Sequence, residues 1–441
     1  MMATLTGTAP RASVVSGRWH GVAAAMFAIA WGGNEFTPLL VMYKSDGLAA
    51  TTVDLLLFYY VLGIVPALLI GGPLSDRHGR RALLRPAPLI AATGSLLLAF
   101  GSGSVPMLSA GRVLCGVALG LAMAVGGSWL KELAQPPHGP RLPAGTGARR
   151  SAMSLTGGFA VGACCAGVLA QWAPWPNSSA YLINVGLCLI AAVWVRRAPE
   201  TVPYRRDPRR LRDDLRIPAA EHRRFRMVAI PVALWLFTSG ATAYAVLPTL
   251  MAPQVAAAPI AFSAALCVIT LGCGFAIQSV ARRIDRTGTA RAAVVALSSV
   301  TVGMILAAAA SDLLTLWATL AAAVALGAGY GIGLVAGLQE IERIARPDDL
   351  AGLTAVFYSA SYLGFGTPAL LSFLHDAYGL GYPAMLGTGA LAAAGCLGLV
   401  LRDYRDRPSP GGGLTPSASA KPAESHVWSS SDSRRSSSPR R

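Results

Sequence analysis

The feature that most constrains this chain is a long series of apolar stretches separated by short polar connections. A bilayer core of roughly 30 Å requires about 20 apolar residues in each spanning helix. Backbone polar groups inside a bilayer must be satisfied within the protein, which restricts a chain of this kind to helical spans. The predicted fold class is therefore an all-α polytopic membrane protein. Twelve stretches qualify as spans: 20–43, 53–74, 82–102, 105–130, 151–172, 178–196, 227–251, 258–281, 291–311, 313–339, 351–374 and 382–401.

The charges of the chain give these spans a direction. Only 13% of the residues are charged, against about 25% in soluble proteins. The net charge of +16 does not indicate nucleic-acid binding, because the basic residues form short clusters between apolar stretches, as loops facing an anionic membrane surface do. Among the Lys and Arg residues, only Lys44 lies in an odd-numbered connection between spans. Arg112 lies inside a span. Since cytoplasmic loops concentrate Lys and Arg, we expect a multi-pass protein of the plasma (inner) membrane with both termini cytoplasmic.

The same distribution divides the chain into five parts. They are a cytoplasmic N-terminal segment at 1–19, a six-helix bundle at 20–196, a basic cytoplasmic linker at 197–226, a second six-helix bundle at 227–402 and a cytoplasmic tail at 403–441. The tail is rich in Ser, Pro, Gly and Arg, a composition that buries too little apolar area to fold. It is predicted to be disordered.

A motif after the second span is echoed after the eighth. The segment GPLSDRHGRR at 72–81 is followed much later by DRTGTAR at 285–291, and each lies between the second and third helix of its half. Parallel six-helix repeats are one way in which secondary transporters are built. The first segment resembles the loop 2–3 motif of the major facilitator superfamily, Gly-x-Leu-(small)-Asp-Arg-x-Gly-Arg-(Arg/Lys). The resemblance implies two pseudo-symmetric six-helix bundles over about residues 20–402.

The resemblance also implies a gating role for this loop. Arg77 and Arg81 are expected to pair with Glu132 at the end of the fourth span. In the second half Glu340 and Glu342 are the expected partners of Arg282, Arg283 and Arg286. An alternative is that these charges only fix the topology. The predicted gating residues are Gly72, Asp76, Arg77, Gly79, Arg80, Arg81, Glu132, Asp285 and Arg286.

Two charged residues, Glu35 and Arg112, lie well inside spans. Such a charge costs roughly 2.5–3.5 kcal/mol on insertion scales, so it usually marks a pathway or a pair. The superfamily fold places the first and fourth spans beside the central cavity. We predict that Glu35 carries the coupling proton and that Arg112 tunes its ionisation. The alternative is a static pair that orients the two helices.

Two further resemblances favour the proton-coupled efflux members of the superfamily. Arg112-Val113-Leu114-Cys115-Gly116 is similar to their fourth-span motif Arg-x-x-Gln-Gly, with Cys115 in place of Gln. Residues 158–167 are similar to the fifth-span antiporter motif Gly-x-x-x-Gly-Pro-x-x-Gly-Gly. Ala163 replaces its Pro and Ala166 replaces a Gly. The loss of the Pro removes a helix kink, so this second resemblance is partial.

Mid-span polar and aromatic residues are candidates for the substrate cavity, although packing is the alternative for each of them. The second half carries no charge deep in any span, which favours a neutral or hydrophobic substrate over an anionic one. Aromatic faces suit amphipathic or cationic ligands. The candidates are Trp31, Asn34, Tyr59, Tyr60, Tyr244, Gln278, Tyr330, Tyr358 and Tyr362.

Other chemistry is not indicated. The sequence contains no phosphate-binding Walker loop, the six His are scattered, and no catalytic constellation accompanies the spans. We therefore predict no enzyme activity, metal or cofactor. The expected function is proton-coupled export of a small neutral or amphipathic organic compound by a monomer. Its expected partners are that compound, protons and the lipid bilayer. The alternatives are uptake of a nutrient such as a sugar or organic acid and, more remotely, a non-transporting sensor.

Overall fold

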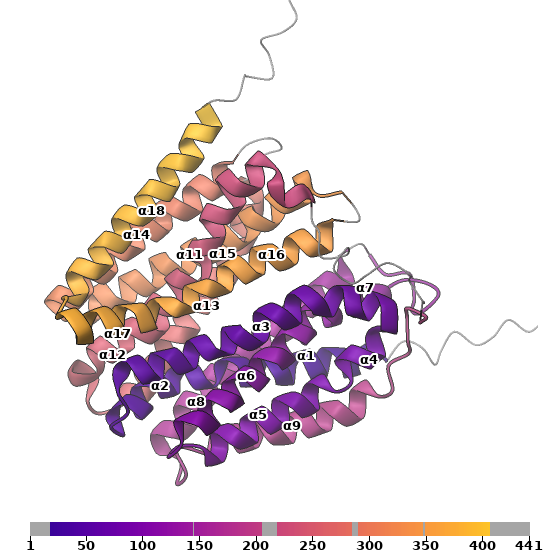
Figure 1. Ribbon diagram of the computed structural model, residues 1–441, viewed down its shortest axis with the longest axis horizontal. Coiled ribbons are helices and arrows are strands. Elements are labelled where there is room, and N and C mark those ends of the chain that lie inside the picture. Colours follow the sequence, from indigo (N-terminus) through magenta and orange to yellow (C-terminus); the bar gives the residue numbers. More distant parts are fainter. Residues whose placement is uncertain (1–17, 144, 205–217, 285–289, 347–348, 406–441) are drawn as a thin grey trace, which may run out of the picture. The chain divides into compact units, whose positions relative to one another are not determined.

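The computed structural model describes residues 18–143, 145–204, 218–284, 290–346 and 349–405, and these are helices joined by short connections (Figure 1). No strand occurs within these ranges. The chain divides into a compact unit, Met1–Tyr404, and a C-terminal unit, Arg405–Arg441. The predicted disordered tail lies almost entirely outside the described residues, as does much of the predicted basic linker.

The helices of the first half form the first six spans. In chain order they are α1 (Trp19–Asn34), α2 (Phe36–Ser45), α3 (Ala50–His78), α4 (Arg80–Leu84), α5 (Ala87–Phe100), α6 (Val105–Leu121), α7 (Gly127–Glu132), α8 (Thr146–Trp172) and α9 (Ser179–Val195). A π-helical turn over Ala122–Gly126 joins α6 to α7 in the fourth span.

The helices of the second half form the other six. They are α11 (Ile230–Ala241), α12 (Leu247–Met251), α13 (Pro259–Ile284), α14 (Arg291–Leu313), α15 (Leu316–Ile344), α16 (Leu350–Tyr362), α17 (Thr367–Tyr378) and α18 (Tyr382–Arg405). Short π-helical turns cover Phe225–Ala229 and Thr242–Val246, and short 3₁₀ turns cover Pro218–Glu221, Ala252–Val255 and Leu363–Gly366.

This architecture confirms the predicted fold class, an all-α chain with twelve spans. Nine of the described helical segments are long and apolar enough to cross a membrane, and Ser179–Val195 is a shorter apolar helix. The first and eleventh spans are each interrupted near their middle, at Glu35 and at Leu363–Gly366, so each is built from two shorter helices.

Proline accounts for the positions of three irregularities. Proline has no amide hydrogen and cannot donate to the carbonyl four residues earlier. Pro38 follows the break at Glu35, Pro248 follows the π-helical turn at Thr242–Val246, and Pro368 follows the 3₁₀ turn at Leu363–Gly366. Turns of this kind concentrate at functional sites in helices.

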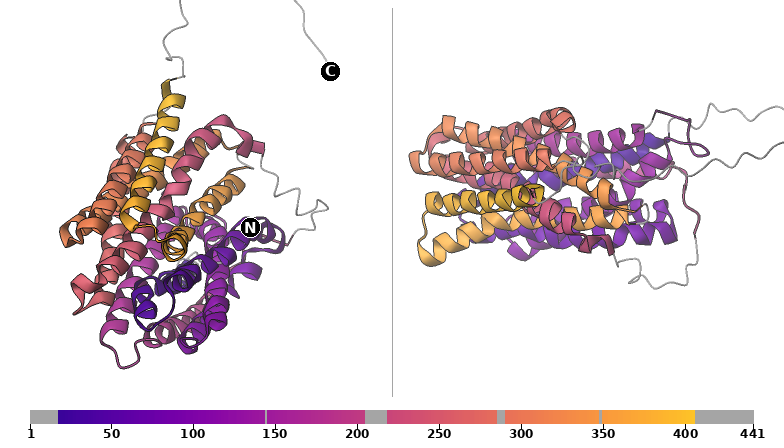
Figure 2. Two further views of the ribbon diagram at one scale, coloured as in Figure 1. Left: turned by 60° about the vertical axis from the view of Figure 1, so that its left-hand side comes forward. Right: turned by 90° about the horizontal axis from the view of Figure 1, so that it is seen from above.

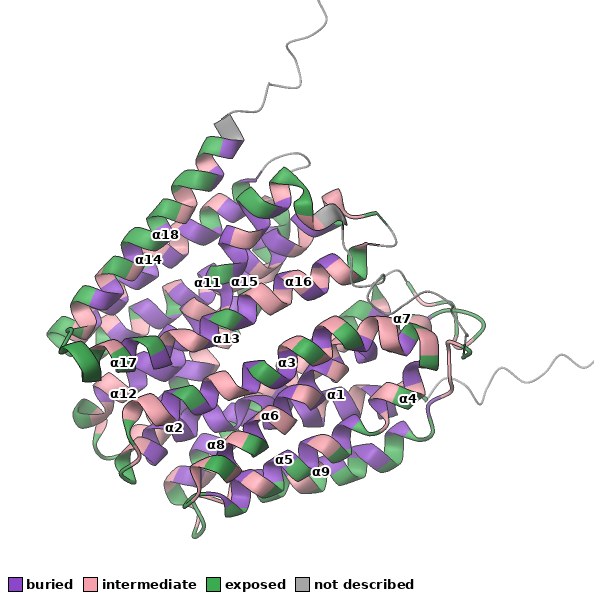
Figure 3. Ribbon diagram, viewed as in Figure 1, coloured by how far each residue is buried: buried purple, intermediate pink, exposed green. Residues whose placement is uncertain are grey.

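The chain has two hydrophobic cores, one centred on each half. One core gathers residues from 22–198 with a few from the seventh, eighth and eleventh spans, and the other gathers residues from 225–400. Figure 2 shows α18 running beside α14, and the Met304 side chain approaches Gly389 between them. In Figure 3 buried residues lie between the helices, while exposed residues follow the outer faces of α9 and α18. Exposed apolar side chains such as Leu391, 74% exposed, suit a surface facing lipid.

The spans run antiparallel, so the bundle has two chemically different ends. We call the end that carries α4, α7 and the cations Arg77–Arg85 the basic end. The opposite end, where α2, α12 and α17 come together in Figure 1, is called the Lys44 end. The side-chain contacts at these two ends differ in kind.

A glycine contact sets the distance between the second and fourth spans. A methyl group added at Gly116 would lie 2.1 Å from the carbonyl oxygen of Tyr60, well inside van der Waals contact. Small residues at such crossings allow helix backbones to approach closely. This contact brings Arg112, one turn from Gly116 on α6, against Tyr60 on α3.

We predict that Gly116→Ala destabilises the protein. The added carbon must push α3 and α6 apart, and overpacking of this kind costs about 1–3 kcal/mol. Thermal unfolding of the purified protein in detergent measures the effect. Gly186→Ala is the matched control, because nothing lies within 4 Å of a methyl group at that position. Equal unfolding temperatures for the two variants would contradict the close crossing.

Candidate functional site

The first half buries a polar cluster around Glu35, whose side chain is 0% exposed. The Ser95 hydroxyl lies 3.1 Å from Glu35 Oε1 and 3.0 Å from Asn184 Oδ1. A hydroxyl has one hydrogen, so it can donate to only one of these oxygens at a time. Glu35 Oε2 has no hydrogen-bond partner. The carboxyl group is therefore buried with incomplete hydrogen bonding.

Arg112, also 0% exposed, is held mainly by aromatic rings. Its guanidinium carbon lies 4.5 Å from the ring centre of Phe36 and 4.3 Å from that of Tyr60. Cation–π contacts of this kind are worth about 2 kcal/mol or more when desolvated. Nε donates to the carbonyl of Leu56 at 3.3 Å, while Nη1 and Nη2 have no hydrogen-bond partner. Glu35 and Arg112 thus share one cluster without forming a direct ion pair.

A small cavity lies on the other side of Tyr60. Its volume is about 30 Å³, enough for a water molecule but not for an organic substrate. Aromatic side chains supply much of its wall, including a stack in which the rings of Phe237 and Tyr362 are centred 4.4 Å apart. Its lining residues come from both halves of the chain: Gly33, Asn34, Tyr60, Leu119, Phe159, Phe237, Tyr244, Leu271, Tyr330, Tyr362 and Phe365.

The structure places five of the nine predicted cavity residues in this wall, namely Asn34, Tyr60, Tyr244, Tyr330 and Tyr362. The other four, Trp31, Tyr59, Gln278 and Tyr358, do not line it. Two wall residues that the sequence prediction omitted are Phe237 and Phe365. Their rings stack on each other at 4.9 Å, but as apolar residues in apolar helices they carried no distinguishing signal.

Asn34 connects the halves at this cavity. Its amide nitrogen donates to the carbonyl of Phe159 at 3.1 Å and contacts Cys267 Sγ in the second half at 3.3 Å. Thr37 donates to the amide oxygen at 2.8 Å. The break in the first span therefore presents one neighbouring residue, Glu35, to the buried cluster and the other, Asn34, to the cavity.

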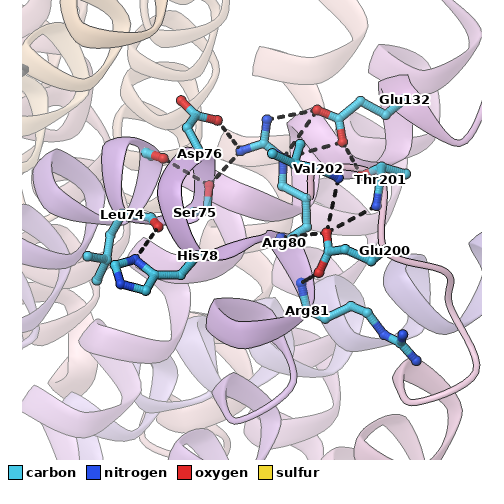
Figure 4. Close-up of polar contacts among 11 residues, drawn as sticks. Leu74, Ser75, Asp76, His78, Arg80, Arg81, Glu132, Glu200, Thr201 and Val202 are labelled. Atoms are coloured by element: carbon cyan, nitrogen blue, oxygen red, sulfur yellow. Dashed lines mark hydrogen bonds and ion pairs between the residues drawn. The ribbon is translucent and has the colours of Figure 1, made fainter. Parts of the chain in front are cut away.

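The loop after the second span forms a polar network at the basic end (Figure 4). Arg80 is its centre, with Nη2 2.7 Å from Glu132 Oε1 and Nη1 2.6 Å from Asp76 Oδ1. Ser75 accepts a further bond from Arg80 at 2.5 Å. Asp76 is 61% exposed, so its own ion pair contributes little to stability.

Glu200, which the sequence prediction missed, organises the start of α4. It accepts hydrogen bonds from the backbone N–H groups of Arg80 and Arg81 at 2.8 and 2.9 Å. A carboxylate at a helix N-terminus satisfies free amides in this way. Gly79 makes the preceding turn with φ +94°, whereas a methyl group at Gly72 would contact nothing.

Among the described residues, Glu132 and Glu340 have partners other than those expected. Glu132 pairs with Arg80, while the side chain of Arg81 reaches the carbonyl of Arg196 at 3.3 Å. In the second half Glu340 contacts neither of the expected Arg282 and Arg283. Its partners are Arg224 and Arg343, both at 2.8 Å. Consecutive side chains along a helix point in directions about 100° apart. A shift of one position, as from Arg81 to Arg80, therefore changes which partner a side chain meets.

Only part of the predicted second copy of the loop lies within the described residues. Asp285 and Arg286 lie outside the described residues. Arg77, at the end of α3, is half-buried. Within the residues that the structure describes, no three metal-ligating side chains come together.

At the Lys44 end, polar contacts join the two halves. Lys44 Nζ lies 2.9 Å from Asp54 Oδ1, and Ser372 in the second half donates a short hydrogen bond to Asp54 Oδ2. Lys44 also reaches Thr249 at 3.4 Å. Asp54 is 2% exposed, so its carboxylate is buried between these partners.

A second contact at this end joins α8 to α13. Gln171 Oε1 accepts from the backbone N–H groups of Ile260 and Ala261 at 3.0 and 3.3 Å. These are among the free amides that open α13. Together with the Asp54 contacts, this bond closes the Lys44 end over the cavity.

The chain has twelve spans packed around two cores, a partly aromatic cavity between its halves and buried charges beside that cavity. These features define a multi-pass membrane transport protein. The comparison of residues 21–257 with known families identifies the Major Facilitator Superfamily, and the chain belongs to it. Its members are transporters rather than enzymes.

Known relatives cover only part of this chain. A triacylglyceride transporter of Mycobacteroides abscessus is 32% identical over 157 residues, 35% of this chain and 29% of that protein. The glucose transporter GlcP of Staphylococcus epidermidis is 31% identical over 96 residues, 22% of this chain and 21% of that protein. The chain thus matches less than a third of the length of either relative.

The fold itself is shared far more widely than the sequence. The crystal structure of a POT family transporter in complex with 5-aminolevulinic acid matches with a TM-score of 0.72 at 12% identity. The match covers 88% of this chain and 96% of that one. At this identity the likeness concerns the fold alone.

We predict that Asp54→Asn loosens the Lys44 end, because Lys44 loses the charge of its buried partner. Cys267, buried beside Asn34, reports the opening through labelling of intact cells with an impermeant maleimide. A ten-fold rise in labelling corresponds to about 1.4 kcal/mol. Thr51→Ala is the control, since its bond to Asp376 is exposed. Unchanged labelling in Asp54→Asn would show that this contact does not hold the end closed.

Proposed function

We propose that this protein is a secondary active transporter that exports a small neutral or amphipathic organic compound in exchange for protons. The observation that carries the proposal is the buried Glu35 beside the central cavity, in a chain of a transporter family. An ionisable side chain inside a membrane span is costly to keep and commonly marks an ion or proton pathway.

The hydrogen bonds around Glu35 support a proton-carrying role. An ionised carboxylate takes the single Ser95 hydrogen and leaves Asn184 Oδ1 without it. A protonated carboxyl donates to the Ser95 oxygen instead, so that Ser95 can still donate to Asn184. Both protonation states therefore have an acceptable partner arrangement, which suits a group that gains and loses a proton in each cycle.

Tyr60 links this event to the substrate. Its ring forms part of the cavity wall and also covers the Arg112 guanidinium at 4.3 Å. A substrate that moves Tyr60 changes the environment of Arg112, and with it the electrostatic field at Glu35. In this scheme Arg112 tunes the proton-carrying group without pairing with it directly.

The cavity wall supports the substrate class. Its polar groups are one amide and four phenols, and no lining residue carries a charge. Such a wall binds apolar and aromatic surface with a few hydrogen bonds. The cavity of about 30 Å³ must enlarge before an organic molecule can enter, so the described state is one in which the site is collapsed.

Alternating access in this proposal exchanges contacts at the two ends. The two six-helix bundles move against each other around the cavity, and the protein acts as a monomer in the plasma membrane with both termini cytoplasmic. The loop network around Arg80 then holds the cytoplasmic end of the first bundle together, and the Asp54 contacts close the outer end. The charge distribution of the loops supports this orientation.

Uptake of a sugar is the second candidate, and the partial match to a glucose transporter favours it. Export by exchange moves the substrate against the coupled proton, whereas uptake by symport moves the two in the same direction. The same vesicle experiment separates them.

We predict that Glu35→Gln abolishes proton-coupled transport while the protein stays folded. Gln fills the same space but cannot exchange a proton. The measurement is dissipation of a pH gradient in inverted membrane vesicles when lipophilic cations or neutral drugs are added. Wild type should release protons on substrate addition, and Glu35→Gln should not.

Glu221→Gln is the matched control, since Glu221 is an exposed carboxylate in the 3₁₀ turn Pro218–Glu221. It should behave as wild type. Coupling retained in Glu35→Gln would remove Glu35 from the proposal. A silent compound panel together with proton-driven uptake of radiolabelled glucose would establish the second candidate.

We further predict that Asp76→Asn slows turnover with little loss of substrate binding. The change removes one ion pair of Arg80 but leaves its contact with Glu132, so the resting structure persists. An exposed pair contributes at most about 1 kcal/mol, which is no more than a few-fold in rate. Transport rates in vesicles and substrate affinity by binding test the prediction. A wild-type rate would reduce the role of Asp76 to topology.

A further inference from the structure

An apolar groove lies on the outside of the first half, away from the cavity. It has a volume of about 540 Å³ and runs over α1 between α8 and α9. Small residues such as Ala24 and Ala28 form its floor, and Phe27 lies on the side of α8. On the other side Ile190 and Trp194 are 53% and 48% exposed, so the groove faces the lipid.

The lining indicates what the groove can hold. Ser154 is its one polar residue, and the Ser154 hydroxyl already donates to the carbonyl of Arg150 at 2.9 Å. Apart from the indole N–H of Trp194, the lining therefore offers no free donor to a polar ligand. Its volume lies within the range of roughly 300–1,000 Å³ that is usual for ligand sites. An extended apolar chain fits this chemistry.

The basic end of the groove carries positive charge from α8 and from the residues that follow α9. Arg150 lies one turn from Ser154 and stacks on the ring of Trp19, 3.8 Å from its centre. Arg196 and Arg197 follow Trp194 and are exposed. The carboxylate of Glu200, which comes soon after them, is already occupied by the backbone amides of Arg80 and Arg81.

We propose that this groove is a binding site for an anionic phospholipid, with an acyl chain over α1 and the phosphate headgroup at Arg150, Arg196 and Arg197. An apolar tail and an anionic head match the two parts of the site. Cations beside a membrane attract anionic headgroups, and clusters of them select such lipids. The proposal concerns a surface apart from the cavity and does not depend on the direction or coupling of transport.

Native mass spectrometry of the purified full-length protein tests the site. The protein is incubated with an equimolar mixture of dioleoyl phosphatidylglycerol and dioleoyl phosphatidylcholine. Wild type should retain phosphatidylglycerol in preference. Arg150→Gln should lower that preference about five-fold, the effect of one cation near an anionic headgroup. Ala24→Leu should reduce retention of both lipids by filling the floor.

Two controls place the effect at the groove. Arg291→Gln removes an exposed cation at the start of α14, and Ala392→Leu adds the same bulk on the exposed face of α18. Both should retain lipid as wild type does. Equal retention of the two lipids by wild type, preferential retention of added uncharged triolein, or an equal loss in Arg150→Gln and Arg291→Gln would overturn the proposal. Arg150→Gln is a surface change, so it remains informative if Ala24→Leu fails to fold.

Discussion

The burial of Glu35 and Arg112 is the constraint on which the first half depends. Removing two charges from water costs several kcal/mol each, and here no direct ion pair repays that cost. Compensation comes from many helices instead. Phe36 and Tyr60 cover the guanidinium from α2 and α3, and Ser95 reaches the carboxylate from α5. Each of these helices must keep its position for the two charges to remain tolerable, which makes the cluster a structural as well as a chemical centre.

Irregular backbone connects this cluster to the cavity. Pro38 leaves the first span broken at Glu35, so successive residues there face different surroundings. Pro248 similarly follows the π-helical turn that carries Tyr244 into the cavity wall. Regular helices present one face every 3.6 residues. Local breaks allow neighbouring positions to face the buried cluster around Glu35 and the cavity at the same level of the bundle.

The two ends of the bundle are held by different kinds of contact. At the Lys44 end, Asp54 and Gln171 bond to groups of the opposite half. At the basic end, Arg80 and Glu340 anchor networks within their own halves. Among the described residues, these side-chain contacts join the halves at the Lys44 end and lie within each half at the basic end. The collapsed cavity between them agrees with a site that changes volume during a cycle.

The sequence by itself determined the twelve spans, the burial of Glu35 and Arg112 and the loop motif, because length, hydropathy and motif spacing are local properties. Only the tertiary structure decided the partners. It gave Glu132 to Arg80 rather than Arg81, placed Ser95 between Glu35 and Asn184, and brought Asp54 into contact with Ser372 of the other half. Partners of this kind lie far apart in the chain, and which of them meet depends on helix rotation and on contacts such as Gly116 with Tyr60. Helix rotation and such contacts are set by packing across the whole bundle, so no single segment of the sequence indicates them.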